Sequence, residues 1–363
     1  MVQPPEPPAW LVDSHIHLDA FEPTELAAGL DELRGRLPEG ARYGALVPGV
    51  NLARSRAALE RFVGLDNVWH AVGIHPWEPL EGPPAVPEQG PVSHDGPHPP
   101  EGPRPPEGPR PPEDPVHGDG REPGRAALDP CAAPDPLDDL EQLAAHPRVV
   151  AIGEIGLDAL RHRGALEQEQ AEVRFVAQLE LARRLDLPVV LHVVRAHERC
   201  LELLRRGGWS GGRAPRGVVH AWGGSVEQAE AYARLGIVVG IGAAVTRERS
   251  RRVRRAAALL PGDGFLLETD APYMYAARPA VSPAVSPAAS PGARLPSAQA
   301  DPGRASEPAP GAGASRGHPC DVLEVLRVVA ALRGEDEAVV RARAGRLFAE
   351  VFRVELAGGA AGV

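Results

Sequence analysis

Six side chains of the types that bind metal ions stand at or near the ends of apolar runs in this 363-residue chain. The runs read WLVDSHIHL, VVAIGEIGL, PVVLHVV, GVVHAW and FLLETDAP. Buried strands of a parallel sheet read as continuous apolar runs, and a (β/α)8 barrel carries its chemistry at the carboxyl ends of such strands. The pattern therefore predicts one metal site built from several strands. Its six candidate ligands are His15, His17, Glu154, His192, His220 and Asp270.

The first candidate pair is His15 and His17, which lie two positions apart at the end of an apolar run. Side chains on a strand alternate between its two faces, so residues two apart point the same way. On a strand over residues 10–18, both imidazoles would face the inside of the barrel mouth and could bind one cation. Asp13 shares that face and is a candidate supporting partner.

Glu154 is the candidate bridge between two cations and a candidate catalytic residue. A carboxylate can bind two cations through its two oxygens, and Gly153 and Gly156 leave room around this one. All 39 basic residues are arginine, so a carbamylated lysine cannot fill the bridging role. If two metals are bridged in this protein, we expect Glu154 to bridge them.

The remaining ligands complete a site for two divalent cations. His192 and His220 end neighbouring strands and could together bind the second cation, whereas Asp270 could bind the first or accept a proton from attacking water. Mixed imidazole and carboxylate ligands suit Zn²⁺ or Mn²⁺ and, with fewer histidines, Mg²⁺. Two such ions would activate water for in-line displacement at phosphorus. Glu268 is expected to be a buried hydrogen-bonding partner rather than a ligand.

The elements that must position these residues alternate between strand and helix, which indicates a parallel sheet. An open doubly wound sheet is the alternative, but it builds its site from the loops of few strands. Only a closed barrel brings polar ends from strands 1, 3, 4, 5, 6 and 8 together, so we predict an eight-stranded (β/α)8 barrel. The expected strands are 10–18, 42–50, 68–75, 149–157, 188–194, 217–222, 237–245 and 265–271.

Two proline-rich segments interrupt this pattern. Residues 78–136 hold 19 of the 41 prolines, and residues 279–319 hold 9 more. Proline lacks an amide donor, and neither segment shows apolar periodicity, so both are predicted to be disordered insertions. The rest of the chain matches the roughly 250 residues of one barrel, and we predict a single domain over residues 1–363. The first insertion carries 12 acidic residues and 4 arginines, so the net charge of −10 does not exclude a polyanionic substrate.

Cysteine usage and hydropathy bear on location. The three cysteines, Cys131, Cys200 and Cys320, are scattered and odd in number, which is typical of a reducing compartment. The first residues have neither the basic nor the apolar region of a secretory signal, and no apolar run has the length of a membrane span. We therefore expect a cytoplasmic protein with no membrane partner.

In combination and order, several blocks of the sequence resemble the TatD-type metal-dependent deoxyribonucleases, a branch of the amidohydrolase-like barrels. The blocks are VDSHIHLD, AVGIHPW, VVAIGEIGLD, QLELARRLDLPVVLH, HAWGGS and LLETDAPY. The resemblance implies that His15, His17, Glu154 and Asp270 surround one metal. It implies that Glu154, His192 and His220 surround the other.

The resemblance also implies candidate substrate contacts. His75 matches the histidine of the family's GIHP block and is expected near the site, as a contact to a substrate phosphate, although a purely structural histidine before a proline turn is an open alternative. After His192 the family has a Ser-Arg-acidic-Ala segment. This chain has Val193, Val194, Arg195 and Ala196 there, so its arginine is displaced by one position. We expect Arg195 to contact substrate.

The leading hypothesis is a two-metal hydrolase that cleaves phosphodiester bonds in DNA from a strand end, with Glu154 and Asp270 as catalytic residues. One alternative is a metal hydrolase on the same frame that acts on a small ester, lactone, amide or phosphoester. Another is a barrel that has lost its activity and binds protein partners through its proline-rich insertions. Segments such as Pro103–Pro106 could dock in aromatic-lined grooves, but a disordered spacer is the favoured interpretation, and the intact ligand set favours an enzyme.

Overall fold

The computed structural model describes residues 10–79, 136–210, 215–277 and 316–356. Within them, eight parallel strands follow one another in chain order, with a helix after each strand. The strands are β1 (Trp10–Asp13), β2 (Arg42–Val47), β3 (Val68–Val72), β4 (Val149–Asp158), β5 (Val189–Val194), β6 (Gly217–Val219), β7 (Ile237–Ile241) and β8 (Phe265–Leu267). The helices are α1 (Pro23–Arg36), α2 (Leu52–Phe62), α3 (Pro136–Ala144), α4 (Ala165–Arg184), α5 (His197–Arg206), α6 (Val226–Ala233), α7 (Arg251–Leu259), α8 (Asp321–Arg333) and α9 (Glu337–Phe352).

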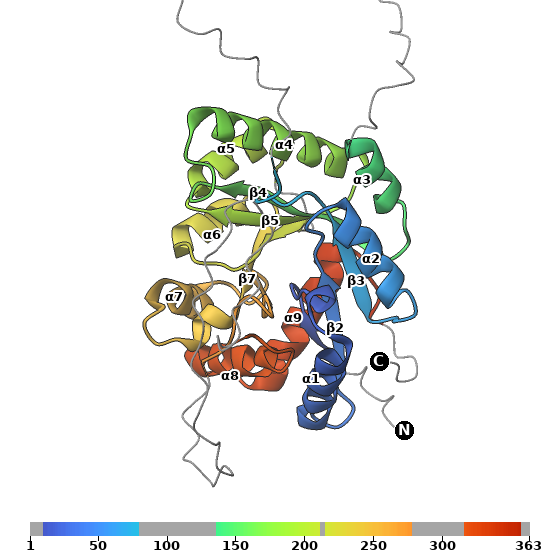
Figure 1. Ribbon diagram of the computed structural model, residues 1–363. Coiled ribbons are helices and arrows are strands. Elements are labelled where there is room, and N and C mark those ends of the chain that lie inside the picture. Colours follow the sequence, from blue (N-terminus) through green and yellow to red (C-terminus); the bar gives the residue numbers. More distant parts are fainter. Residues whose placement is uncertain (1–9, 80–135, 211–214, 278–315, 357–363) are drawn as a thin grey trace, which may run out of the picture. The chain divides into compact units, whose positions relative to one another are not determined.

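The eight strands form a nearly closed barrel with the helices around it (Figure 1). Each strand pairs in parallel with the next along the chain, from β1–β2 through β7–β8. The first and last strands are joined by backbone hydrogen bonds just beyond their carboxyl ends. Ser14 N donates to Leu267 O, and Asp270 N donates to His15 O, each at 2.9 Å. This architecture confirms the predicted (β/α)8 fold.

Six of the eight strands, β1, β2, β3, β6, β7 and β8, end earlier than predicted, and at β1 the difference matters for the site. β1 ends at Asp13, so His15 and His17 lie in the segment that follows it rather than on a strand over residues 10–18. The backbone leaves the ladder because Ile16 N donates across to Leu46 O, and a 3-10 turn begins at Leu18. The two imidazoles still converge, with ring centroids 5.2 Å apart, but their shared direction comes from this irregular segment and not from strand alternation.

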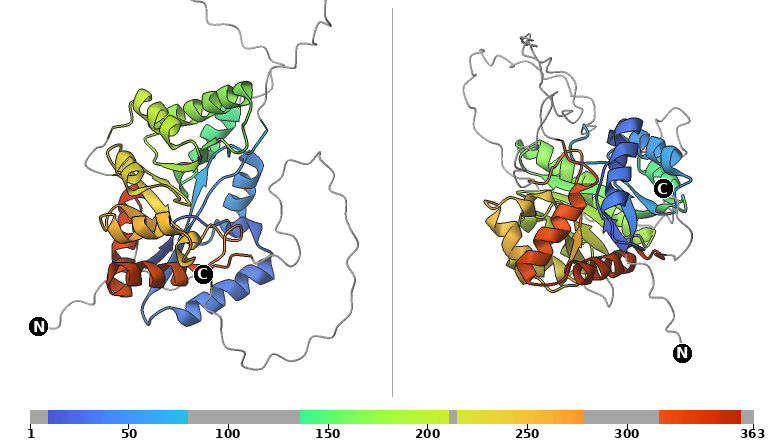
Figure 2. Two further views of the ribbon diagram at one scale, coloured as in Figure 1. Left: turned by 90° about the vertical axis from the view of Figure 1, so that its left-hand side faces the viewer. Right: turned by 90° about the horizontal axis from the view of Figure 1, so that it is seen from below.

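The barrel has two apolar layers. The larger one packs the outward faces of the strands against α1 to α8. The smaller one fills the barrel interior and includes residues of α9, where Phe348 contacts Trp69 at a ring-centroid distance of 5.2 Å. Gly345 of α9 lies against the backbone oxygen of Trp10, the first residue of β1. Helix α9, red in Figure 2, therefore covers the amino end of the barrel and leaves the carboxyl end to the polar residues.

Residues 80–135 and 279–315, which make up most of the two predicted insertions, lie outside the described residues, as does Cys131. The predicted bounds were too wide, because residues 78–79, residue 136 at the start of α3, and residues 316–319 belong to the described structure. Gly317 is buried and its N–H donates to Pro272 O, and His318 N donates to the side chain of Asp321.

Cys200 and Cys320 are buried free thiols. Among the helices of the described ranges, none has both the length and the apolar character that crossing a bilayer requires.

A buried histidine on β3 predicts acid sensitivity of the fold. His70 is 2% exposed, stacks near Phe62, and its Nε2 has no hydrogen-bond partner among the described residues. Burial, with smaller contributions from His146 and Arg148, lowers the pKa of His70 to about 4. The unfolded chain therefore takes up this proton at a higher pH than the folded chain does, and stability is lost as the pH falls from about 6.5 towards 4.

We expect this one group to remove about 3 kcal/mol of unfolding free energy across that range, at about 1.4 kcal/mol per pKa unit. Denaturant unfolding of the wild type and of His70→Leu, each at pH 7 and at pH 4.5, measures this loss of unfolding free energy. The drop between the two pH values should be about 2–3 kcal/mol smaller in the variant. Equal drops in the two proteins would show that His70 does not stay neutral when folded.

Candidate active site

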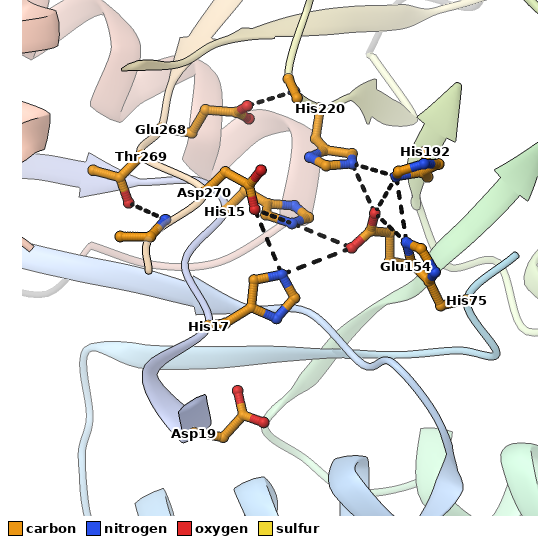
Figure 3. A network of polar contacts seen from close by, with 12 residues as sticks. His15, His17, Asp19, His75, Glu154, His192, His220, Glu268, Thr269 and Asp270 are labelled. Atoms are coloured by element: carbon orange, nitrogen blue, oxygen red, sulfur yellow. Dashed lines mark hydrogen bonds and ion pairs between the residues drawn. The ribbon is translucent and has the colours of Figure 1, made fainter. Parts of the chain in front are cut away.

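Glu154, at the carboxyl half of β4, lies at the centre of a cluster of imidazoles and is 2% exposed (Figure 3). Its two oxygens face different partners. Oε2 lies 3.3 Å from His15 Nε2 and 3.9 Å from His17 Nε2. Oε1 lies 2.7 Å from both His192 Nδ1 and His220 Nε2. One carboxylate therefore separates two groups of nitrogen donors.

Asp270 completes the first of these groups. Its Oδ1 lies 3.8 Å from His15 Nε2 and 3.6 Å from His17 Nε2, and its side chain is 14% exposed. Asp13 fixes this junction between β1 and β8. Its carboxylate accepts hydrogen bonds from the backbone N–H of His15 and from both the N–H and the hydroxyl of Thr269. Asp13 thereby ties the segment that carries His15 to the segment that carries Asp270.

His75 reaches the cluster from the end of β3, and α4 holds it there. The Gln178 amide bonds both the N–H and the carbonyl of Ile74, and the Arg174 guanidinium donates to four backbone carbonyls between residues 75 and 79. Trp77 N donates to His75 Nδ1 at 3.0 Å. A neutral imidazole has one acceptor and one donor nitrogen, so Nε2 carries the proton and points at Glu154 Oε1, 3.0 Å away. His75 is therefore a hydrogen-bond donor into the site.

Asp158 is a residue of the site that the sequence reasoning missed. Its Oδ2 accepts a hydrogen bond from Trp77 Nε1 at 2.6 Å and lies 3.5 Å from His192 Nε2. A carboxylate on the outer nitrogen of a ligand histidine fixes the ring and raises its basicity. Its spacing in the sequence could have identified it. Asp158 lies four residues beyond Glu154 on the same strand, and residues an even number apart on a strand share a face.

Three strand ends around the cluster adopt the left-handed backbone region with residues other than glycine. They are Arg195 after β5, Ala221 after β6 and Asp270 after β8, with φ of 52°, 48° and 55°. Such residues are uncommon outside turns and persist where the surrounding structure holds them. At Ala221 the support is the Glu268 side chain, whose Oε1 accepts the Ala221 N–H. Glu268 is 0% exposed, and burial raises its pKa well above the usual range. It is the hydrogen-bonding partner that the sequence predicted.

The electrostatics of the cluster fit bound cations. Burial, which would raise the pKa of Glu154, is outweighed by His220, His75 and His15, and the pKa stays well below its usual range. Burial and the neighbouring His15 hold the pKa of His17 well below its ordinary value, and burial also lowers the pKa of His220. An anionic carboxylate and neutral imidazoles are the protonation states that metal binding requires, and Glu154, His17 and His220 have them. His192 differs: burial, which would lower its pKa, is outweighed by Asp158 and Glu154, which raise it to about 9, so a cation would bind there by displacing a proton.

The nitrogen atoms themselves give the sharper test of fit. His192 Nδ1 lies 3.1 Å from His220 Nε2, and both face the same Glu154 oxygen. Two ring nitrogens this close together, on different strands and aimed at one carboxylate oxygen, are placed as two ligands of a single cation would be. Both nitrogens of His15 are buried without a hydrogen-bond partner among the described residues, although such atoms are usually satisfied. The residues present therefore suit divalent metal ions.

The structure brings most of the predicted site residues together. All six predicted ligands and His75 meet at the carboxyl end of the barrel within one contact network (Figure 3). Arg195 does not join this network. Its side chain is exposed beyond β5, among Asp158, Ala196 and Arg199.

At Gly156 the backbone of β4 lies against the backbone of β5 with no room for a side chain. The φ of Gly156 is 147°, and a Cβ there would lie 2.0 Å from the backbone oxygen of His192. Gly156→Ala would push β4 from β5 between Glu154 and His192. We expect it to destabilise the fold by about 3 kcal/mol or more, because backbone strain adds to overpacking. Denaturant unfolding measures the effect, with Gly223→Ala as the control, since a Cβ at Gly223 meets nothing within 4 Å. Similar stability of the two variants would contradict the expectation.

A (β/α)8 barrel whose carboxyl end gathers buried imidazoles around a central carboxylate defines a metal-dependent hydrolase. The comparison with known families agrees. Residues 12–353 match the family model described as TatD related DNase. The chain belongs to this family, as its sequence blocks indicated.

Individual relatives support the assignment. The chain is 39% identical over 214 residues to a protein of Erwinia billingiae named 3'-5' ssDNA/RNA exonuclease TatD. The aligned region covers 58% of this chain and 69% of that protein. It is 43% identical over 141 residues to the uncharacterized metal-dependent hydrolase YjjV of Escherichia coli, over 38% of this chain and 52% of that one. The aligned segment thus spans about half the length of this second relative. The crystal structure of YjjV shares the fold, with a TM-score of 0.62 over 95% of this chain and 98% of that chain at 23% identity.

Proposed function

We propose that this hydrolase cleaves phosphodiester bonds in single-stranded DNA, working from a strand end with two divalent cations bound in the cluster around Glu154. Mg²⁺, Mn²⁺ and Zn²⁺ are the candidate ions, since the ligands mix imidazole and carboxylate. The observation that carries the proposal is the division of one buried carboxylate between two sets of donors. The strand preference and the exonuclease mode rest on what the Erwinia billingiae relative is named for.

In this proposal, His15, His17 and Asp270 would hold one cation and His192 and His220 would hold the other, and Glu154 would serve as a ligand for both. Bound cations of this kind lower the pKa of a coordinated water and neutralise charge on a phosphoryl oxygen. Asp270 is the most exposed carboxylate of the cluster, at 14%. Its carboxylate orients the attacking water and takes up its proton, because a general base must lie within hydrogen-bond reach of the proton that it abstracts.

The other residues of the site position the ligand side chains or contact the phosphates of the substrate. His75 presents its one ring N–H, at Nε2, towards Glu154 Oε1, and in this proposal a non-bridging oxygen of the scissile phosphate takes over that hydrogen bond when substrate binds. Asp158 and Trp77 fix the ring of His192, and Asp13 fixes the segment that carries His15. Arg195, exposed beyond the cluster, contacts a neighbouring phosphate of the strand rather than the scissile one. Phosphate contacts of this kind position a nucleic acid without reading its sequence.

We also propose that residues 1–363 act as one catalytic domain, because the family match runs from residue 12 to residue 353 across both proline-rich segments. A reducing, cytoplasmic setting stays a prediction from cysteine usage. Protein partners of the proline-rich segments also stay a prediction.

The decisive experiment uses single-stranded and double-stranded DNA labelled at the 5′ or the 3′ end, incubated with the full chain and each cation in turn. Shortening of 5′-labelled single strands by single nucleotides from the 3′ end supports the proposal. Cleavage of bis(p-nitrophenyl) phosphate or of a carboxylic ester, with DNA left intact, would instead identify a hydrolase of small esters on the same frame.

A further inference from the structure

A hollow of about 150 Å³ opens beside the metal-binding cluster, between the carboxyl ends of β4 and β5 and helices α4 and α5. Asp158 connects the two places, because it lines the hollow and also faces His192 Nε2. Of the residues that line the hollow, the proposed mechanism uses only Asp158 and Arg195. The eight that it does not use are Leu157, Ala159, His162, Gln168, Ala171, Glu172, Ala196 and Arg199.

The lining suits a flat, uncharged ring. Three of its ten residues are alanine, and these small side chains together with Leu157 leave the space open. A cavity of about 150 Å³ is large enough for a benzene-sized ring. His162 is 7% exposed, and its Nδ1 has no hydrogen-bond partner among the described residues. Burial, and next the nearby Arg174, lower its pKa, so the imidazole is neutral at pH 7 and can offer one donor and one acceptor.

The charges around the hollow place an anion beside it rather than inside it. The Asp158 oxygens already accept hydrogen bonds from Trp77 Nε1 and from the N–H groups of Leu160 and Arg161. The Glu172 carboxylate pairs with Arg199. These two carboxylates would repel a phosphate held between them.

Arg195 is the one cation of the lining that forms no ion pair within the described ranges, and its side chain is exposed. It suits a phosphate attached to a ring in the hollow, since a guanidinium binds phosphate through a bidentate fork.

We propose that this hollow binds the nucleobase of a nucleotide adjacent to the scissile phosphate, with Arg195 on that nucleotide's own phosphate. The inference rests on the proposed nuclease function and adds a subsite to it. It predicts that the enzyme requires a base at one position of the strand, not only a sugar-phosphate backbone.

The first test measures binding without turnover, on the full chain. We expect 2′-deoxyadenosine 5′-monophosphate to bind at least about tenfold more tightly than 2-deoxyribose 5-phosphate, because stacking and burial of a base are worth a factor of this size. Ala171→Leu, which fills the hollow, should abolish the difference. Ala196→Leu, at a less buried position, gives the same test if Ala171→Leu does not fold. Val173→Leu, exposed on the same helix, is the matched control. Equal affinity of the wild type for the two ligands would overturn the proposal.

The second test separates this inference from the proposed function. Single-stranded DNA with one abasic residue, moved stepwise from the 3′ end, should be cleaved about tenfold more slowly at one position by the wild type, and no further slowing should occur in Ala171→Leu. Uniform cleavage of every abasic substrate by an active enzyme would refute the base subsite alone. Selective nucleotide binding without any DNA cleavage would keep the subsite and refute the nuclease.

Discussion

Glu154→Gln is expected to reduce hydrolysis of any phosphodiester substrate by at least about 1,000-fold, because one carboxylate serves both groups of donors. The substitution keeps the shape of the side chain but removes the negative charge that lies between five imidazoles. An amide offers only one oxygen to a cation, so both predicted metal positions lose a ligand or its charge. Loss of the charge that holds two cations removes most of what a metal-assisted mechanism supplies, which is several kcal/mol of transition-state stabilisation.

Two measurements check this expectation, namely the turnover of DNA and of a dye-linked diester, and the metal content after dialysis. Both should fall together in Glu154→Gln. The matched control is Glu268→Gln, another buried carboxyl group at the same end of the barrel. Because burial raises the pKa of Glu268, an uncharged amide should replace it with a much smaller loss of activity and with full metal content. Undiminished turnover in Glu154→Gln would remove Glu154 from the mechanism.

The types and order of the site residues were predictable from the sequence because each follows an apolar run, and a closed barrel leaves such residues only one place to meet. The path of the chain between them was less predictable. His15 and His17 converge although β1 ends at Asp13, since hydrogen bonds to neighbouring strands direct this segment. No local pattern shows such long-range bonds.

Supporting contacts were the hardest part to predict. The roles of Asp158 and Trp77 depend on a contact between the ends of β3 and β4 across 81 residues of chain, most of them in the first proline-rich segment. The donor state of His75 depends on the Trp77 N–H, two residues further on. Arg195 was predicted to contact substrate from its place in a motif. Its side chain is exposed and lies outside the metal-binding cluster, so contact with substrate stays a prediction.

Removal of metal is expected to inactivate the enzyme and to lower its melting temperature, with both restored by one of Mg²⁺, Mn²⁺ or Zn²⁺. A ligand that binds only the folded state stabilises it by about 2.7 kcal/mol at a concentration of 100 Kd. Chelator-treated protein should therefore melt earlier than reconstituted protein. The same treatment should leave the melting temperature of Glu154→Gln almost unchanged. An equal shift in both proteins would mean that the stabilising ion binds elsewhere.

The division of the Glu154 oxygens makes this prediction more specific. His17 lies on the Oε2 side and His192 on the Oε1 side, so His17→Gln and His192→Gln should each lower the metal content of the reconstituted protein from two ions to one. The remaining ion should retain part of the thermal stabilisation in each variant, whereas Glu154→Gln should lose nearly all of it. A single ion in the wild type, lost in both histidine variants, would show instead that the carboxylate serves one cation and that its second oxygen only accepts hydrogen bonds from the surrounding imidazoles.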